Sequence, residues 1–391
     1  MHDRFVGPAA PAPLHVTAEE LRGRLARVQR RLVEEGLDAL LVFAPESHYW
    51  ATGLDTGGYV FFQAGIIPAT GDPTLLTRRP DLAQAQDTSL YPDIRIWYDA
   101  ADADPAAELR AILAERGLGG CRIGIERDTY GLTAANGRRV DAALEGFCRL
   151  VDAGHVIRRL RLIKSASEIA IIRRAAHLAD RAVAAIRGVA QPGVLDSELT
   201  AACLSTILAG GGDMPPAGPL VNSGRRSVYG RGVGGPRRLE ARDQVVVEFA
   251  ATLHRYNACI ERTILLGAVP DQLARMRDAV AQAMAAMLAA ARPGAPIGAI
   301  AAAHHAVLDA EGFSGARFSA CGYSLGATFR PSWMDVPPMI HPGNPMPLEP
   351  GMVLFPHAML GDAEAGLGFG SGDTILITET GAEPLTSAPF S

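Results

Sequence analysis

The feature that most constrains this chain is a change in its hydrophobic pattern near residue 160. Before that point, short apolar runs of strand length alternate with helical segments, a pattern typical of an α/β domain with a largely covered sheet. We expect helices after the N-cap residue Thr17 and over Asp104–Arg116 and Thr133–Glu145. The expected strands are Ala39–Phe43, Tyr59–Ile67, Pro73–Thr77, Ile94–Tyr98 and Arg122–Glu126.

The segment Val156–Ala170 carries two basic clusters and then a helix start, so we place a domain boundary there, between domains 1–160 and 161–391. In the second domain long helices come first and strands predominate later, which favours an α+β fold. A Gly- and Pro-rich loop is expected over 210–236. The expected elements are helices over Glu168–Val189, Asp196–Ala209, Asp271–Ala291 and Ile297–Glu311, a hairpin of Gln244–Ala250 and Ala258–Leu266, and strands over Met352–Met359 and Asp373–Thr378 separated by a Gly-Asp turn.

Composition excludes several classes of partner. The net charge is −5, so the chain lacks the basic excess that binding to nucleic acid requires. No run of about 18 apolar residues would span a membrane, and the first residues lack the apolar stretch of a signal peptide, so we expect a cytoplasmic protein. Five scattered cysteines without a CxxC pair argue against a disulfide framework or a zinc–thiolate site. No glycine-rich loop matches a nucleotide-binding motif, and no cofactor is expected.

Five segments, in order, resemble the creatinase and aminopeptidase-P-like proteins. They are RLRLIKSASEIAIIRRAA, VVVEFAATLHRYNACIERT, CGYSLG, EPGMVLFPHAML and GSGDTILITETGAEPL. The resemblance implies a creatinase-type N-terminal α/β domain, a C-terminal domain with the pita-bread fold, a small-molecule substrate and a homodimer.

The peptidases of this group hold two metal ions with two Asp, one His and two Glu. By the resemblance, those five positions fall here on Glu248, Cys259, Tyr323, His357 and Gly372. Only one carboxylate remains, and two hard cations need several oxygen or imidazole ligands. We therefore expect no metal, although Glu248, Cys259 and His357 leave a single zinc site open.

Creatinase cleaves a C–N bond on this fold without metal, and its pocket Glu before Arg-Thr matches Glu261 in IERT. The position of its catalytic His falls on Arg231, which cannot shuttle protons near pH 7. The position of its second Glu falls on His357. The resemblance thus implies four catalytic residues, which are Glu261, His357, Glu248 and Tyr323. The structural alternative for Glu261 is an ion pair with Arg262 or Arg255.

The GYSLG loop followed by PSWMD resembles the ectoine-hydrolase branch of these proteins. Trp333 and Asp335 could there form a wall and a counter-ion for a cationic or zwitterionic substrate. Arg231 or Arg330 could clamp a carboxylate in a bidentate pair. The expected substrate contacts are Arg231, Tyr229, Cys259, Arg330, Trp333, Asp335 and Phe62.

The resulting hypothesis is a hydrolase that acts on a C–N bond of a small polar or zwitterionic substrate, such as an amidine, guanidino compound or amide, without metal. Three alternatives stay open. They are a metal-dependent Xaa-Pro aminopeptidase or dipeptidase, a lyase on the same fold, and a non-catalytic pseudo-peptidase. A Cys259 nucleophile with His357 as its base is a further possibility within the first hypothesis.

Overall fold

The computed structural model describes residues 3–6 and 16–390, and the chain divides into two compact units, Met1–Arg161 and Leu162–Ser391. The first unit is an α/β domain and the second an α+β domain, which confirms the predicted fold class. No helix in the described ranges has both the length and the apolar character to cross a bilayer. The homodimer stays a prediction.

The first unit is built on a mixed seven-stranded sheet, ordered β1-β5-β4-β3-β2-β6-β7. Its strands are β1 (Asp3–Val6), β2 (Ala39–Val42), β3 (Ala64–Pro68), β4 (Thr74–Arg78), β5 (Asp93–Trp97), β6 (Arg122–Ile125) and β7 (Arg149–Asp152). Its helices are α1 (Ala18–Glu34), α2 (Pro45–Thr52), α3 (Leu82–Thr88), α4 (Pro105–Glu115) and α5 (Ala134–Leu144), with the 3-10 turns η1 (Gly58–Val60) and η2 (Arg79–Asp81). The helix α6 (His155–Leu162) ends at the boundary between the units.

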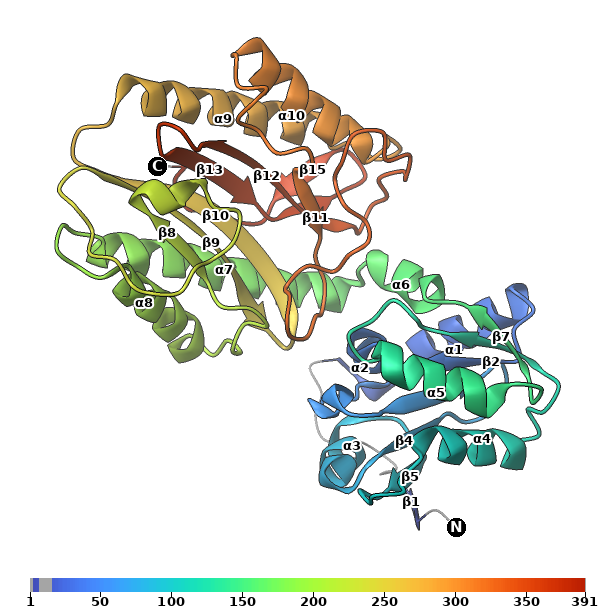
Figure 1. Ribbon diagram of the computed structural model, residues 1–391. Helices are drawn as coiled ribbons and strands as arrows, with labels where there is room; N and C mark the ends of the chain where they lie inside the picture. Colours follow the sequence, from blue (N-terminus) through green and yellow to red (C-terminus); the bar gives the residue numbers. More distant parts are fainter. Residues whose placement is uncertain (1–2, 7–15, 391) are drawn as a thin grey trace. The chain divides into compact units, whose positions relative to one another are not determined.

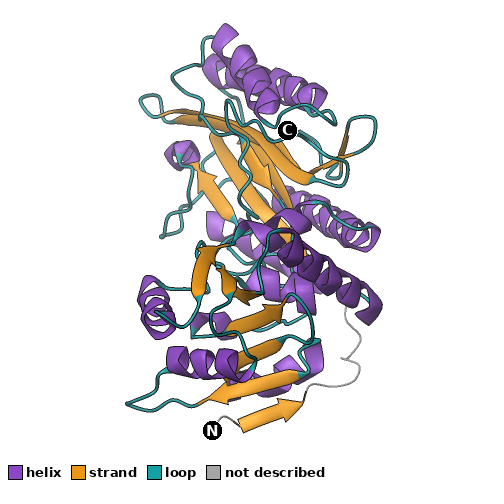
Figure 2. Ribbon diagram, turned by 90° about the vertical axis from the view of Figure 1, so that its right-hand side faces the viewer, coloured by secondary structure: helices purple, strands orange, loops and turns teal. Residues whose placement is uncertain are grey.

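Both faces of this sheet are covered (Figures 1 and 2). Leu41 packs toward α4 and α5, whereas its neighbour Leu40 packs toward α1, α2 and α6, as the alternation of a strand requires. The helix α1 starts where the sequence indicated, because the hydroxyl of Thr17 accepts a hydrogen bond from Glu20 N. The expected strand Tyr59–Ile67 is wrong in its first half, which forms η1 and a short loop before β3.

The second unit begins with α7 (Ala166–Val189) and α8 (Asp196–Ala209) and then forms an antiparallel sheet, ordered β15-β14-β12-β13-β10-β9-β8. Its strands are β8 (Leu220–Ser223), β9 (Asp243–Leu253), β10 (Tyr256–Leu266), β12 (Val353–Asp362), β13 (Leu367–Asp373), β14 (Ile375–Ile377) and β15 (Ala382–Pro384). The short strand β11 (Gly322–Ser324) pairs with β12. The remaining elements are the 3-10 turn η3 (Gly224–Val228) and the helices α9 (Asp271–Ala290) and α10 (Gly298–Ala310).

The helices α7 to α10 cover one face of this sheet (Figure 1). The helices α7 and α8, green in Figure 1, pack their apolar side chains on Val247 of β9 and Ile260 of β10. Side chains of α9 and α10 pack on Leu360 of β12 and Phe369 of β13. Because neighbouring residues of a strand alternate between faces, the residues next to these core positions point to the face that the helices leave uncovered.

Two further expectations for this unit need correction. The segment 210–236 is not an uninterrupted loop, because it contains β8 and η3. The stretch between the expected strands Met352–Met359 and Asp373–Thr378 is more than a turn, because it also contains β13. Glycine is uncommon inside strands, which is why the sequence indicated a turn there. The hairpin was placed correctly, and its turn falls at His254 and Arg255, whose φ values of 48° and 65° suit a two-residue connection.

Candidate active site

Four residues stand in one row across the middle of the second sheet. Glu248 on β9 is directly opposite Glu261 on β10, Glu261 is opposite Gly372 on β13, and Gly372 is opposite His357 on β12. Directly paired residues of antiparallel strands share a face. We call these four residues the cross-sheet row. The row lies on the face that α7 to α10 do not cover, because its neighbours Val247, Ile260 and Ala358 belong to the helix-covered cores.

Glu261 and His357 meet across the glycine position of this row. The Glu261 side chain is 1% exposed and the His357 side chain 15%, and His357 Nδ1 lies 3.4 Å from Glu261 Oε2. Neither of these two atoms has a well-aligned hydrogen-bond partner in the described residues, and their contact becomes an ion pair when His357 is protonated.

Glycines make this meeting sterically possible. A Cβ at Gly372 would lie 2.6 Å from His357 Cβ, and a Cβ at Gly370 would collide with Glu261 Oε1. Gly370 and Gly372 are two residues apart on β13 and therefore point to the same face. The alternating glycines of the GSGD stretch thus leave the space that the acid and the imidazole occupy.

Two hydrogen bonds at the Tyr323 hydroxyl join Glu248 to Tyr323 and Trp333. The Tyr323 hydroxyl donates to Glu248 Oε1 at 2.8 Å, and Trp333 Nε1 donates to the same hydroxyl at 2.8 Å. Because an indole N–H can only donate, it fixes the hydroxyl oxygen as its acceptor and leaves the Tyr323 proton directed at Glu248. The Cys259 sulfur lies 3.6 Å from the hydroxyl oxygen. The Phe355 ring stacks on the His357 ring at 5.4 Å.

The pKa values of Glu248 and His357 depend on burial and on the charges around them, including the carboxylates Glu248 and Glu261. Burial and the nearby Glu261 raise the pKa of Glu248, although His357, Tyr323 and Arg231 oppose the shift. Burial alone would lower the pKa of His357, but Glu261, and then Glu248, outweigh it and raise that pKa above its ordinary value. His357 is therefore more readily protonated here than in water.

Burial also raises the pKa values of Cys259 and Tyr323 well above their ordinary range. Cys259 has no exposed surface. A thiol with a raised pKa is a poor nucleophile, because the thiolate is the reactive form. The arrangement therefore disfavours the Cys259 nucleophile, and it places the thiol against Tyr323 instead of at an accessible surface.

Two other predicted contacts lie on the loop after η3. Tyr229 and Arg231 are exposed, and Asn222 of β8 holds their backbone by donating to both carbonyl oxygens at 3.0 and 3.4 Å. The Arg231 guanidinium is close enough to the row to affect the pKa values of Glu248 and His357. The structure therefore brings Arg231 near the predicted catalytic residues.

Three further residues predicted to contact substrate, Asp335, Arg330 and Phe62, differ in how buried they are and in what surrounds them. Asp335 is 8% exposed and packs where Gly326 leaves room, and Arg330 is exposed. Phe62 lies in the core of the first unit, where its ring packs edge-on against Phe43 at 5.7 Å. These neighbours are typical of a core residue. The role of Phe62 as a substrate contact therefore stays a prediction.

The predicted ion pair of Glu261 with Arg262 or Arg255 is wrong. Arg262 does not pair with the Glu261 carboxylate, because successive residues point to opposite faces of the sheet. It donates instead to the main-chain oxygen of Glu261 at 2.8 Å and pairs with Asp373 at 2.6 Å. Arg255 stacks over the Phe329 ring at 4.8 Å.

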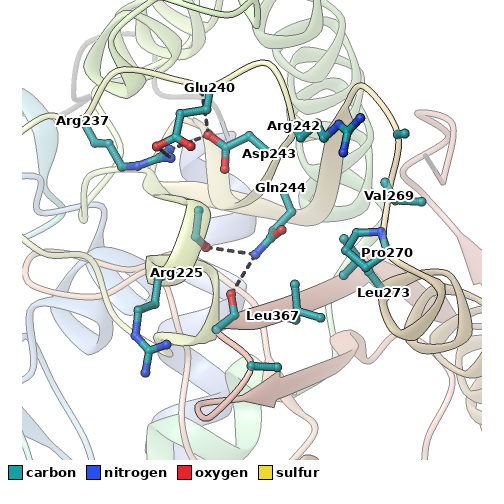
Figure 3. Close-up of a pocket in the computed structure, with 14 residues that line it drawn as sticks. Arg225, Arg237, Glu240, Arg242, Asp243, Gln244, Val269, Pro270, Leu273 and Leu367 are labelled. Carbon is teal, nitrogen blue, oxygen red and sulfur yellow. Dashed lines mark hydrogen bonds and ion pairs between the residues drawn. The ribbon is translucent and has the colours of Figure 1, made fainter.

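A pocket of about 600 Å³ lies at the start of β9, away from the predicted site residues (Figure 3). Gln244 anchors its wall by donating to Gly224 O at 3.2 Å and Gly366 O at 2.9 Å. Arg237 is neutralised by Asp243 and Glu240. Since none of the predicted site residues lines this pocket, we do not assign it to the reaction.

Comparison with known families agrees with this architecture. Residues 24–163 match the creatinase/prolidase N-terminal domain, and residues 170–379 match metallopeptidase family M24. The chain belongs to family M24. The creatinase and aminopeptidase-P-like resemblance and the pita-bread fold are thereby confirmed.

Several M24 relatives align over nearly the whole chain. An ectoine hydrolase from Halomonas elongata is 29% identical over 96% of this chain and 97% of its own length. A Xaa-Pro dipeptidase from Pyrococcus furiosus is 26% identical over 94% and 98%. Among solved structures, the Thermococcus sibiricus prolidase superposes with a TM-score of 0.86 at 20% identity, covering 94% of this chain and 97% of its own, a likeness that concerns the fold.

The M24 name implies a metal centre, and the residues at the ligand positions do not fit a dinuclear one. Gly372 offers no ligand, and a larger side chain there would collide with His357. The Tyr323 hydroxyl is already shared by Glu248 and Trp333. Within residues 3–6 and 16–390, no three His, Cys, Asp or Glu side chains are grouped so as to hold a metal ion. We therefore assign no step of the reaction to a metal.

Proposed function

We propose that this M24 protein hydrolyses a C–N bond of a small polar or zwitterionic non-peptide substrate, an amidine, guanidino compound or amide, by side-chain acid–base chemistry. The observation that carries the proposal is the contact of Glu261 with His357 across Gly372, beside the Glu248–Tyr323 pair. A positioned acid–base residue contributes roughly 10²- to 10⁴-fold to such a reaction. The ectoine hydrolase among the relatives supports a non-peptide substrate.

In the proposed reaction His357 moves one proton. Its Nδ1 faces Glu261, so we assign the proton transfer to the other ring nitrogen, Nε2. Nε2 takes a proton from a water molecule as the water oxygen bonds to the scissile carbon. The resulting imidazolium, stabilised by Glu261, then returns the proton to the leaving nitrogen as the C–N bond breaks.

The two carboxylates select the charge of the substrate. Glu248 and Glu261 lie directly opposite one another and would hold the positive side of an amidinium or guanidinium group. Arg231 would hold a carboxylate at the other end of a zwitterion, because its charge already acts on the row. Tyr323 has its proton committed to Glu248 and so orients that carboxylate.

A substrate panel with product identification tests this proposal. Cyclic amidines, guanidino acids and N-acylated amino acids are incubated with the protein, and products are identified by mass spectrometry. We expect products that gain one water across a C–N bond. An elimination product without added water would support the lyase, and no turnover of any compound by intact protein would support the pseudo-peptidase.

A metal-dependent Xaa-Pro dipeptidase is the second candidate, and the relatives with that name favour it. A panel of Xaa-Pro dipeptides, assayed with and without added Mn²⁺, Co²⁺ and Zn²⁺, separates the two. Metal-stimulated cleavage of the dipeptides, with the small amidines left intact, would select the dipeptidase.

A further inference from the structure

The back face of the cross-sheet row is held by one buried arginine. Arg262 follows Glu261 on β10, is 2% exposed, and points to the face that the helices cover. Its Nη1 donates to the main-chain oxygens of Glu261 and Gly372, each at 2.8 Å. These acceptors belong to two members of the row itself.

The other donors of Arg262 reach acceptors more than 110 residues away in sequence. Nη2 donates to Ala388 O at 2.8 Å and to Asp373 Oδ1 at 2.6 Å, and Nε donates to Pro389 O at 3.0 Å. We call residues 385–389 the 385–389 strap. With these bonds all five N–H donors of the guanidinium have acceptors, which fixes its position far more firmly than a single ion pair would.

The strap is anchored independently to helix α7 and to the end of β13. Asp180 accepts hydrogen bonds from Ser387 N at 2.8 Å and from Ala388 N at 2.8 Å. Thr386 donates to Asp373 Oδ1 at 2.7 Å, the same oxygen that Arg262 contacts. One continuous set of hydrogen bonds therefore runs from α7 through the strap and Arg262 to the backbone beneath Glu261.

We propose that Arg262 is a positioning residue, which couples the 385–389 strap to the backbone of Glu261 and Gly372 and so sets the separation of Glu261 and His357. Glu261 and His357 sit on strands that do not pair with each other, because β13 lies between them. Their separation therefore depends on how β10 is held against β13, where the two strands pair directly only at Ile260 and Glu261. Arg262 bonds the main chain of both strands at this short pairing.

The proposal rests on the proposed function for its kinetic test, and a second readout is independent of turnover. The test variant is Arg262→Lys, which keeps the charge but loses the planar set of donors. The milder variant, Asp180→Ala, releases the strap from α7 without changing β10. The matched control is Arg173→Gln, which removes an exposed arginine that links α7 to Glu383 by an ion pair at 2.7 Å.

In the kinetic test, kcat and KM are measured per folded molecule with the substrate identified by the panel. We expect Arg262→Lys to lower kcat roughly 10- to 100-fold. KM should change less than about threefold. Asp180→Ala should show a smaller loss of kcat, and Arg173→Gln none. A merely structural role would reduce the amount of folded protein while leaving kcat per folded molecule unchanged, which would overturn the proposal.

The independent readout is the NMR titration of the His357 ring, assigned with His357→Gln. If the strap holds Glu261 against His357, the titration midpoint should fall by about 1 unit in Arg262→Lys. It should fall less in Asp180→Ala and not at all in Arg173→Gln. If Arg262→Lys does not fold, Asp180→Ala decides alone. An unchanged midpoint in the folded strap variants would overturn the positioning role, whether or not a C–N substrate has been found.

Discussion

Glu261 and His357 lie on strands separated by a third, and they meet at 3.4 Å because the residue between them, Gly372, has no side chain. At this position the resemblance places a metal-ligating glutamate in the peptidases. This chain has a glycine at that position, and Glu261 and His357 meet beside it. A side chain at this position would enter the space that the acid–imidazole pair occupies.

Gly372→Ala should disrupt the pair directly. The added methyl would lie 2.6 Å from His357 Cβ, so either the imidazole or the strand must move. We expect the free energy of unfolding to fall by about 1–3 kcal/mol. Turnover should fall by more than the loss of folded protein explains. The control is Gly188→Ala in α7, where no atom lies within 4 Å and stability should be equal or higher. Wild-type turnover in Gly372→Ala would contradict the steric argument.

Glu261→Gln should abolish turnover while changing the free energy of unfolding by no more than about 1–2 kcal/mol. The amide keeps the shape of the side chain but cannot stabilise an imidazolium. Stability is measured by urea unfolding and turnover with the substrate found by the panel. Glu383→Gln, which alters a half-exposed carboxylate on β15, is the matched control and should keep full activity. Undiminished turnover in Glu261→Gln would remove Glu261 from the mechanism.

Tyr323→Phe should shift the acidic limb of the pH–rate profile to higher pH. The Tyr323 hydroxyl donates to Glu248 and lowers its pKa, so without the hydroxyl Glu248 ionises at higher pH. Trp333 Nε1 also loses its acceptor, which should cost about 1–3 kcal/mol of stability. Tyr98→Phe, an exposed tyrosine of the first unit, should leave the profile unchanged. A shift of the acidic limb to lower pH would show that Tyr323 does not stabilise ionised Glu248.

The raised pKa of His357 predicts how stability depends on pH. A histidine whose pKa is higher in the folded than in the unfolded state stabilises the fold fully below its unfolded value, about 6.5, and this contribution is lost as pH rises through the folded value. The stability difference between wild type and His357→Gln should therefore shrink as the pH rises. Urea unfolding across this range measures it, with His177→Gln, an exposed position on α7, as control. A difference that grows with pH would contradict the ion pair with Glu261.

Local patterns predicted much of the fold and the strands of the site. The Thr17 cap and the hairpin around His254 each depend on a few neighbouring residues, whereas the role of Glu261 was implied by the family resemblance of IERT. The cap and the hairpin could be predicted because capping, alternation and turn chemistry act over short distances.

The contacts of Gly372, Trp333 and Arg262 at the candidate site could not be predicted from local sequence patterns. Gly372 has no side chain, so its part in the site leaves no signal in the sequence. Glycine is also uncommon inside strands, so the sequence favoured a turn in this stretch. The role of Trp333 as a donor to Tyr323 depends on the path of an irregular loop. Arg262 finds its acceptor Ala388 across 126 residues of sequence, a pairing that no local pattern contains.

The central claim is that side chains, rather than a metal, perform the acid–base chemistry in this M24 protein. The most direct test measures turnover of the panel substrate by protein that has been stripped with a chelator and shown to be metal-free by elemental analysis. We predict unchanged kcat, with no gain when Mn²⁺, Co²⁺ or Zn²⁺ is restored. Turnover that disappears on stripping and returns with a stoichiometric ion would contradict the account.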